Sequence, residues 1–564
     1  MARSLAASPE RRTVAVSAGN ARPLAGWLHF APWIVGIAGL AALVWFDLGP
    51  NLPSNDDWMF AWSVKRLATG HGVQKVPDLA PLGLVQLFWG TLVSLGHVDY
   101  RLLRLSALPF CLLAVFCTHR LALNLGASRF WASVAACGLL TAPLFLALST
   151  TFMSEVFYVG LLMAVALTAE TWVSRGRAAP ICVGLVALAF LERQTAVYVP
   201  AAITIALLLA RRRRTVSARE WIYVAGMWLA IGSLFLVVEL AGLDRATSGR
   251  GLAILQHLAV DNLFLTVWYL PAMLGLFSTP FILALFRRRP AEPTELAVRR
   301  RGRPRIGVIL TGTLIPLAIA QLVLLSLRGR LTIPGNYLTL AGLGPTILSG
   351  TKPNVYPAWL FLAIEMAATA ALIGLLFNLR VGMSWRRLQP GVALMLLLGI
   401  AQLVPLLIGR TFDRYYLPAV VVVLPVIALM ATRTRPVPGG AATVAAVLTM
   451  VGGLLLYVIG EQDYQSWQSA RDAAARQAFA TTPPALVQAG FEANGVYFEL
   501  PGYERYGLPD RAPILNPELL PSIVGPAHPV VRLEYASPDD PRPGVSYRSI
   551  ASGKIVIIGG HAAY

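Results

Sequence analysis

The stretch Ser54-Asn55-Asp56-Asp57-Trp58 places two adjacent carboxylates directly after the first long apolar segment of the chain, residues 30–48. Charged residues make up only 13% of the 564 residues, so acids are used sparingly. Because a carboxylate near hydrocarbon costs free energy, an acid pair at the edge of a membrane helix indicates a functional site. A structural alternative stays open, in which Asp57 or Asn55 caps an amphipathic helix expected over residues 58–69.

The composition around this stretch is typical of a membrane protein. Hydrophobic residues make up 56% of the chain, and its mean hydropathy is +0.63, which is too apolar for a soluble protein of this length. Apolar runs of about 20 residues recur, and each can cross a bilayer as a helix. We therefore expect a polytopic α-helical membrane protein with about thirteen transmembrane helices.

The charge distribution indicates how the chain is oriented in the membrane. A formal net charge of +19 in a soluble protein would indicate nucleic-acid binding. Here the arginines cluster in short loops between apolar runs, as the positive-inside rule describes, so no nucleic-acid partner is expected. The basic N-terminal arm, residues 1–27, should be cytoplasmic, and the C-terminal end should be extracytoplasmic, in a bacterial plasma (inner) membrane.

The apolar run 178–210 is 33 residues long and is interrupted only by Glu192-Arg193-Gln194. Basic residues flank both ends, which predicts a hairpin of two short helices with this tripeptide at its outer tip. Alternatively, the Glu192–Arg193 pair is a structural salt bridge in the membrane. Counting spans from the basic loops places six charged residues on one outer side: Asp56, Asp57, Glu155, Arg193, Asp413 and Arg414.

The four cysteines lie inside apolar segments without CxxC spacing, which indicates small core residues and neither disulfides nor a zinc site. The domain boundaries follow from the spans and from a fall in hydrophobicity after residue 460. We expect a transmembrane domain over residues 28–460 and an extracytoplasmic α/β domain over residues 461–564. The transmembrane domain should have a first external loop at 49–100, which includes an interfacial apolar stretch at 82–95, and a second long external loop at 328–357. In the α/β domain we expect a helix at 465–479 and strands at 496–500, 530–535 and 554–558.

The residue types on the outer side indicate group transfer. A carboxylate within hydrogen-bond reach of a hydroxyl or amine can act as a general base, and Arg or Lys can hold a phosphate. Outside the plasma membrane no nucleotide-activated sugar is supplied, so a donor sugar would arrive on a lipid carrier. An acid beside a phosphate clamp at this position therefore favours transfer from a lipid phosphate.

Several short motifs follow one another along nearly the whole chain. They are Asn55-Asp56-Asp57-Trp58, Ala80-Pro81-Leu82-Gly83, Leu102-Leu103-Arg104-Leu105-Ser106, Thr151-Phe152-Met153-Ser154-Glu155, Arg193-Gln194, Asp413-Arg414-Tyr415-Tyr416-Leu417-Pro418, Asp463-Tyr464 with Trp467 and Arg471, and Gly490-Phe491-Glu492. In order, spacing and common sidedness they resemble the membrane-embedded GT-C glycosyltransferases of the protein O-mannosyltransferase and lipid A aminoarabinose transferase type.

The resemblance implies inverting transfer of a sugar from a polyprenyl-phosphate donor to a lipid, glycan or protein acceptor. Asp56 would be the base that deprotonates the acceptor. Asp57 stands where the family often has Glu, and would orient the acceptor, position Asp56 or touch a metal. The chain lacks a His-rich ligand set, so we expect no required metal or other cofactor, with a divalent ion as the open alternative.

The same resemblance assigns residues to the donor. Arg414 and Tyr415 would lie near its phosphate, Lys75 and Arg193 could hold the same charge, and Glu155 stands where related enzymes often carry Asp. For Arg414 the alternative is a headgroup anchor, and for Lys75 a solvated charge. Trp58 and Trp62 are interpreted as members of an aromatic belt.

Two other functions stay open. A lipid or polysaccharide flippase or transporter would show ionisable residues at mid-membrane and paired repeats, whereas here the charges gather on one side and no repeat is evident. A surface-glycan polymerase or ligase shares the donor type and the sidedness. The sequence does not encode which sugar is moved or which acceptor receives it.

Overall fold

The computed structural model describes most of the chain. The described residues are 30–74, 81–95, 97–241, 260–286, 316, 319–320, 335–345, 348–350, 352–382, 388–407, 412–435, 439–483, 486–499, 531–547 and 553–559.

Long apolar helices make up most of the described part, which confirms a polytopic α-helical membrane protein. Eight helices are long and apolar enough to cross a membrane by length and composition, or nine if a bent pair is counted as one span. Six of them are α4–α5 (Tyr100–Leu125), α8 (Ser154–Arg175), α11 (Ala218–Leu240), α17 (Ala358–Gly382), α19 (Asp413–Thr434) and α20 (Gly440–Thr481). The seventh is Trp268–Phe286, which comprises the C-terminal part of α13 (Val260–Ser278) together with α14 (Ile282–Phe286). The eighth is Pro390–Leu407, which begins with α18 (Pro390–Leu403). The count of thirteen stays a prediction, and the span expected over residues 306–327 lies almost wholly outside the described residues.

Shorter helices complete the bundle. They are α1 (Ala31–Asp47), α2 (Asp57–Ala68), α3 (Leu84–Ser94), the bent pair α6 (Arg129–Leu140) and α7 (Pro143–Ser149), α9 (Ala179–Glu192) and α10 (Val199–Ala210). The 56° bend between α6 and α7 falls at Pro143, since proline readily begins a helix but cannot continue one. The expected hairpin is confirmed, because α9 and α10 are joined through a short 3₁₀ turn, Gln194–Tyr198.

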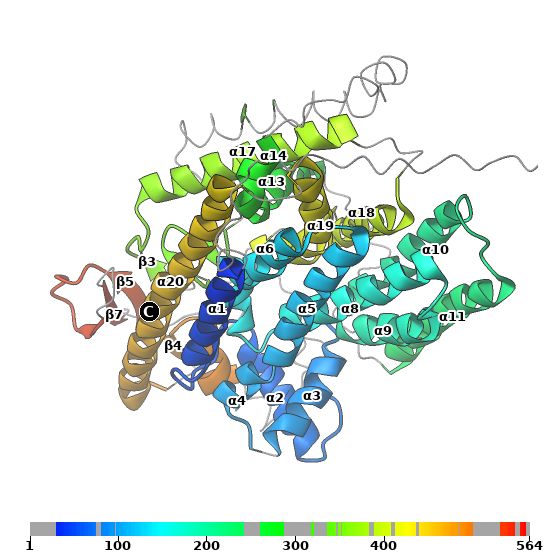
Figure 1. Ribbon diagram of the computed structural model, residues 1–564. Helices are drawn as coiled ribbons and strands as arrows, with labels where there is room; N and C mark the ends of the chain where they lie inside the picture. The colour runs from blue at the N-terminus through cyan, green and yellow to red at the C-terminus, as the bar shows by residue number, and fades with distance from the viewer. Residues whose placement is uncertain are drawn as a thin grey trace, which may run out of the picture.

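The arrangement places α8 and α19 in the centre of the bundle (Figure 1). These two helices are the most deeply buried of the spans, and α5 and α18 pack against them. The hairpin α9–α10 and α11 lie on one side, and α13, α14 and α17 lie on another. Loops at the starts of α2, α8 and α19 meet at one end of this core.

Helix α20 runs unbroken for 42 residues, from Gly440 to Thr481, so the expected boundary at residue 461 falls inside a helix. The separate helix expected at residues 465–479 is its second half. Hydrophobicity falls after Gly460, but Ala, Glu, Gln and Arg follow, and all four favour the helix. A fall in hydrophobicity marks where a helix leaves the apolar core and does not by itself end it.

A small sheet packs against the second half of α20. Its strand order is β3 (Ser349–Gly350), β5 (Val531–Ala536), β7 (Gly553–Gly559) and β6 (Gly544–Tyr547), with β4 (Val487–Gln488) also beside β5. The strands expected at 530–535 and 554–558 are confirmed. The strand expected at 496–500 is wrong, because residues Gly495–Glu499 form a π-helix turn after α21 (Phe491–Asn494).

The sheet also joins distant parts of the chain. Strand β3 belongs to the second long external loop and pairs in parallel with β5, about 185 positions later, at Ser349–Glu534 and Gly350–Tyr535. The sheet and α20 share a core that includes Trp467, Tyr535 and Ile555. The division at residue 461 into two domains stays a prediction.

Candidate active site

Acidic residues converge where three helices begin. Asp57 is the first residue of α2 and Asp413 the first of α19, while Glu155 is the second residue of α8. The N-terminus of a helix carries partial positive charge, which stabilises carboxylates there. This placement explains how a low-dielectric bundle keeps several buried acids at one end.

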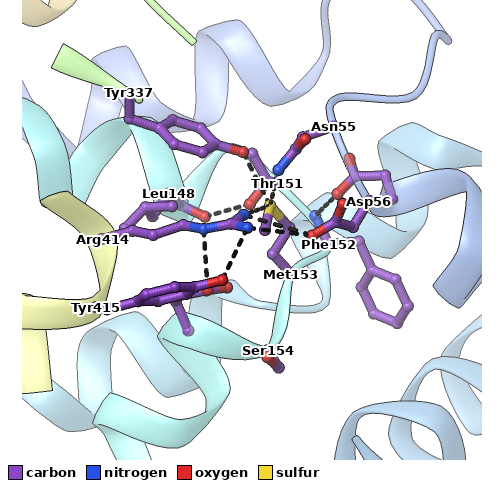
Figure 2. Close-up of polar contacts among 12 residues, drawn as sticks. Asn55, Asp56, Leu148, Thr151, Phe152, Met153, Ser154, Tyr337, Arg414 and Tyr415 are labelled. Carbon is purple, nitrogen blue, oxygen red and sulfur yellow. Dashed lines mark hydrogen bonds and ion pairs between the residues drawn. The ribbon is translucent and has the colours of Figure 1, made fainter. Parts of the chain in front are cut away.

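Arg414 lies in the centre of the site, where it contacts Asp56 (Figure 2) and also Glu155. Its Nη1 lies 3.4 Å from Asp56 Oδ2, and its Nε lies 3.6 Å from Glu155 Oε1. Its guanidinium lies 5.1 Å from the ring centroid of Tyr415 and 5.9 Å from that of Tyr337. These ion pairs are longer than the 2.7–2.9 Å of strong charge-assisted hydrogen bonds, so Arg414 keeps capacity for another anion.

Arg193 is held more firmly than Arg414. Its Nη2 donates to Glu155 Oε1 at 2.9 Å, and its Nε donates to Ser154 Oγ at 3.1 Å. Its predicted structural partner, Glu192, instead accepts from the Gln86 backbone N–H at 2.9 Å. Arg193 therefore ties the hairpin tip to the start of α8 and fixes the carboxylate that faces Arg414.

The two acids of the first external loop occupy different environments. The side chain of Asp56 is 23% exposed and faces Arg414, whereas Asp57 is fully buried. Burial raises the pKa of Asp56 above its ordinary value, and the Arg414 guanidinium opposes that rise. Asp56 is thus the acid of the pair that a substrate can reach.

Asp57 links two loops and does not contact the open site. Its Oδ1 accepts from the Phe152 backbone N–H at 2.9 Å, and its Oδ2 accepts from the Ser54 N–H at 3.2 Å. Burial raises its pKa well above the ordinary range, against the opposing effects of Arg104 and these N–H groups. The capping interpretation is wrong, because α2 begins at Asp57 with Asp56 at the N-cap position and no side chain caps it.

The loop that covers Arg414 comes from the second long external loop. Asp413 Oδ2 accepts from three successive backbone N–H groups, those of Asn336, Tyr337 and Leu338, at 2.8–3.3 Å. This holds the fully buried Tyr337 over Arg414, with its hydroxyl 2.8 Å from Met153 Sδ. Tyr337 and Met153 were not among the predicted site residues, although the loop length and the Thr151–Glu155 motif pointed to their segments.

Two other sequence interpretations have clear outcomes, whereas Lys75 lies outside the described residues. Trp58 and Trp62 are 1% and 3% exposed, so the aromatic-belt interpretation is wrong and both belong to the core. Arg414 is 7% exposed and paired with acids, which does not fit a headgroup anchor.

Within the described residues, no group of three or more His, Cys, Asp or Glu side chains is placed to hold a metal ion. All four cysteines are described, and they are buried and free.

Comparisons with known proteins find structures but no sequence family. No protein-family model and no curated protein matches the chain. Two solved structures are similar over 93% of this chain and 97% of theirs. They are ArnT from Cupriavidus metallidurans bound to undecaprenyl phosphate, at 15% identity and a TM-score of 0.42, and the same protein in the apo state, at 16% identity and a TM-score of 0.39.

Proposed function

We propose that the protein is an integral-membrane glycosyltransferase that moves a sugar from a polyprenyl-phosphate donor to an acceptor on the extracytoplasmic side. The observation that supports this most directly is the meeting of Asp56 and Arg414 at the end of a bundle of apolar helices. One reachable carboxylate and one loosely paired guanidinium provide a base and an anion site side by side. Such a pair is what an acceptor hydroxyl and a lipid phosphate leaving group require.

In the proposed reaction Asp56 accepts the proton of the acceptor hydroxyl or amine. The acceptor oxygen or nitrogen then attacks the anomeric carbon, the carbon–oxygen bond to the lipid phosphate breaks, and the anomeric configuration is inverted. The phosphate leaves with the electron pair, and Arg414 stabilises its negative charge. At the end of the step the proton is on Asp56, and the negative charge on the phosphate is paired with Arg414.

The surrounding residues have supporting roles in the proposal. Arg193 and Glu155 form the short ion pair that orients Arg414. Tyr415 and Tyr337 flank the guanidinium and restrict its side-chain rotamers. Asp57 fixes the loop that carries Asp56. Lys75 remains a candidate phosphate ligand on sequence grounds.

The test is sugar transfer in membranes that contain either the wild type or the Asp56→Asn variant. A panel of radiolabelled polyprenyl-phosphate sugars serves as donors, with undecaprenyl phosphate as the first carrier. We expect labelled product with the wild type and a loss of about 10²–10⁴-fold in the variant, the usual contribution of a general base. Donor binding should persist in the variant, because the phosphate contacts come from Arg414.

Other outcomes identify the competing functions. Equal transfer by wild type and Asp56→Asn would remove Asp56 from the mechanism. Labelled lipid that crosses the bilayer without any product would indicate a flippase. A product that lengthens with time would indicate a polymerase of surface glycans.

A further inference from the structure

The residue before Asp56 has an unusual backbone conformation. Asn55 has φ of +51°, in the left-handed region, which is costly for residues other than glycine although Asn tolerates it better than most. The backbone at Asn55 determines where the next side chain points. The direction of Asp56 therefore depends on whatever keeps Asn55 in this conformation.

A buried carboxylate from the far end of the chain holds Asn55. Glu492 Oε1, on α21, accepts from the Asn55 backbone N–H at 2.9 Å, across 437 positions of sequence. Glu492 is fully buried, and its Oε2 lies 2.5 Å from Arg471 Nη1 on α20. Arg471 is itself buried and lies over the Trp467 ring, 4.8 Å from the centroid.

A second contact from α20 secures the residues just before Asn55. Gln468 Nε2 lies 3.0 Å from the Pro53 carbonyl oxygen, to which it donates, and 3.2 Å from Ser54 Oγ. Asp57 holds the other side of the loop through Ser54 and Phe152. The first external loop is thus fixed on both sides, and Glu492 contacts the residue whose backbone is strained.

We propose that Glu492 and Arg471 are positioning residues for Asp56, acting through the left-handed backbone of Asn55. The carboxylate of Glu492 keeps Asn55 in place, and Arg471 neutralises and orients that carboxylate. Asp56 is then directed toward Arg414 instead of relaxing away from it. This inference rests on the proposed function, because it assigns Asp56 as the group to be positioned.

The charges make the proposal specific. Glu492 and Asp56 are both acidic. The negative charge of Glu492 raises the pKa of Asp56, although burial and the charge of Glu155 raise it more. Arg471 offsets that charge through the 2.5 Å ion pair. Changing either partner should therefore shift the pH profile of transfer in a direction set by its charge.

The main experiment is a double-mutant cycle in the full-length protein between Glu492→Ala and Asn55→Gly. Glu492→Ala alone should lower kcat about 10- to 100-fold with little change in KM for the donor, because a small misplacement of a reacting group has an effect of this size. Glycine adopts the left-handed conformation without strain. Adding Asn55→Gly should therefore restore kcat at least several-fold.

Two further variants distinguish positioning from general stability. Glu492→Gln keeps an acceptor oxygen for Asn55 but removes the negative charge, so the acidic limb of the pH profile should move to lower pH. Arg471→Met leaves Glu492 uncompensated, so the same limb should move to higher pH. Glu220→Gln is the matched control, because Glu220 forms a 2.6 Å ion pair with Arg214 at the start of α11 and should leave the profile unchanged.

The outcomes separate this inference from the proposed function. If the wild type transfers no sugar from any donor, the proposed function fails, and the same cycle is then measured by thermal unfolding. In that measurement a smaller loss of Tm from Glu492→Ala in the Asn55→Gly background supports the hold on Asn55, and equal losses overturn it. If the wild type is active, equal kcat losses in both backgrounds, or unshifted pH profiles, overturn the positioning role.

Discussion

At the residue scale, the two arginines of the site differ in how firmly they are held. Arg193 has a 2.9 Å ion pair with Glu155, whereas the ion pairs of Arg414 are 3.4 and 3.6 Å long. A strong existing pair must be broken before a new anion can be bound, and weak pairs exchange at small cost. Arg414 is therefore the better ligand for a donor phosphate, and Arg193 serves the structure of the site.

The first prediction compares lysine substitutions at these positions. Arg414→Lys should raise KM for the donor by about 10- to 100-fold, because lysine loses the planar, bidentate geometry and a hydrogen bond to a charged group contributes about 1.5–3 kcal/mol. The measurement is steady-state kinetics with varied donor. Arg193→Lys, the matched control, should lower Tm more than it changes KM. A larger KM effect at Arg193 than at Arg414 would contradict the assignment.

The second prediction concerns pH. Only the ionised form of Asp56 can accept a proton, so transfer should be lost as the pH falls through its pKa. Burial raises that pKa, so the loss should begin at higher pH than for a free aspartate, whose pKa is about 3.9. Because Arg414 lowers the pKa of Asp56, Arg414→Met should move the acidic limb to still higher pH. A profile of kcat/KM that stays flat down to pH 4 would exclude Asp56 as the base.

At the scale of elements, close packing of α20 against the rest of the bundle depends on glycine. A Cβ at Gly453 would lie 2.6 Å from the Thr141 carbonyl oxygen, at the bend between α6 and α7. A Cβ at the neighbouring Gly452 would meet nothing within 4 Å. Small residues at such crossings allow helix backbones in a membrane to approach closely.

This pair of glycines gives the third prediction. Gly453→Ala should destabilise the protein by about 1–3 kcal/mol, the usual cost of overpacking, because the bend or α20 must move. Gly452→Ala should be neutral or slightly stabilising, since alanine favours a helix over glycine. Thermal unfolding in detergent compares the two variants. Equal Tm values would show that α20 does not contact the bend this closely.

At the scale of the whole molecule, the second long external loop is fixed at both ends of its described part. Asp413 holds residues 336–338, and Lys352 forms a 3.1 Å ion pair with Asp463 of α20. Both partners of that ion pair are buried. Burial lowers the pKa of Lys352, although the negative charge of Asp463 acts to raise it. The loop therefore connects the site, α20 and the sheet.

The fourth prediction tests this connection. Lys352→Met should destabilise the protein by about 3–5 kcal/mol, because it removes the cation that forms an ion pair with the buried carboxylate of Asp463. Changing both partners, as Lys352→Met with Asp463→Leu, should be less destabilising than Lys352→Met alone, since no buried charge is then left over. Denaturant unfolding of the wild type and of the two variants measures this. A double variant that is the least stable of the three would refute the ion pair.

The sequence by itself determined the class of the protein and the residues to examine. Apolar runs, basic loops and the hairpin pattern predicted a polytopic helical bundle, because hydrophobicity and charge act locally in a membrane. Counting those spans assigned Asp56, Glu155, Arg193 and Arg414 to one side, and their side chains do contact one another. These signals depend only on neighbouring residues, so they can be read without the fold.

Only the tertiary structure decided which groups pair. It showed that Asp57 is buried and accepts hydrogen bonds from two backbone N–H groups, whereas the neighbouring Asp56 is partly exposed and faces Arg414. It also brought Tyr337 over Arg414 and Glu492 onto Asn55. The Asn55–Glu492 contact joins residues 437 positions apart in the sequence, and no local pattern encodes it. The physical reason is that burial and hydrogen-bond geometry, which set the chemistry of an acid, exist only after distant helices have packed.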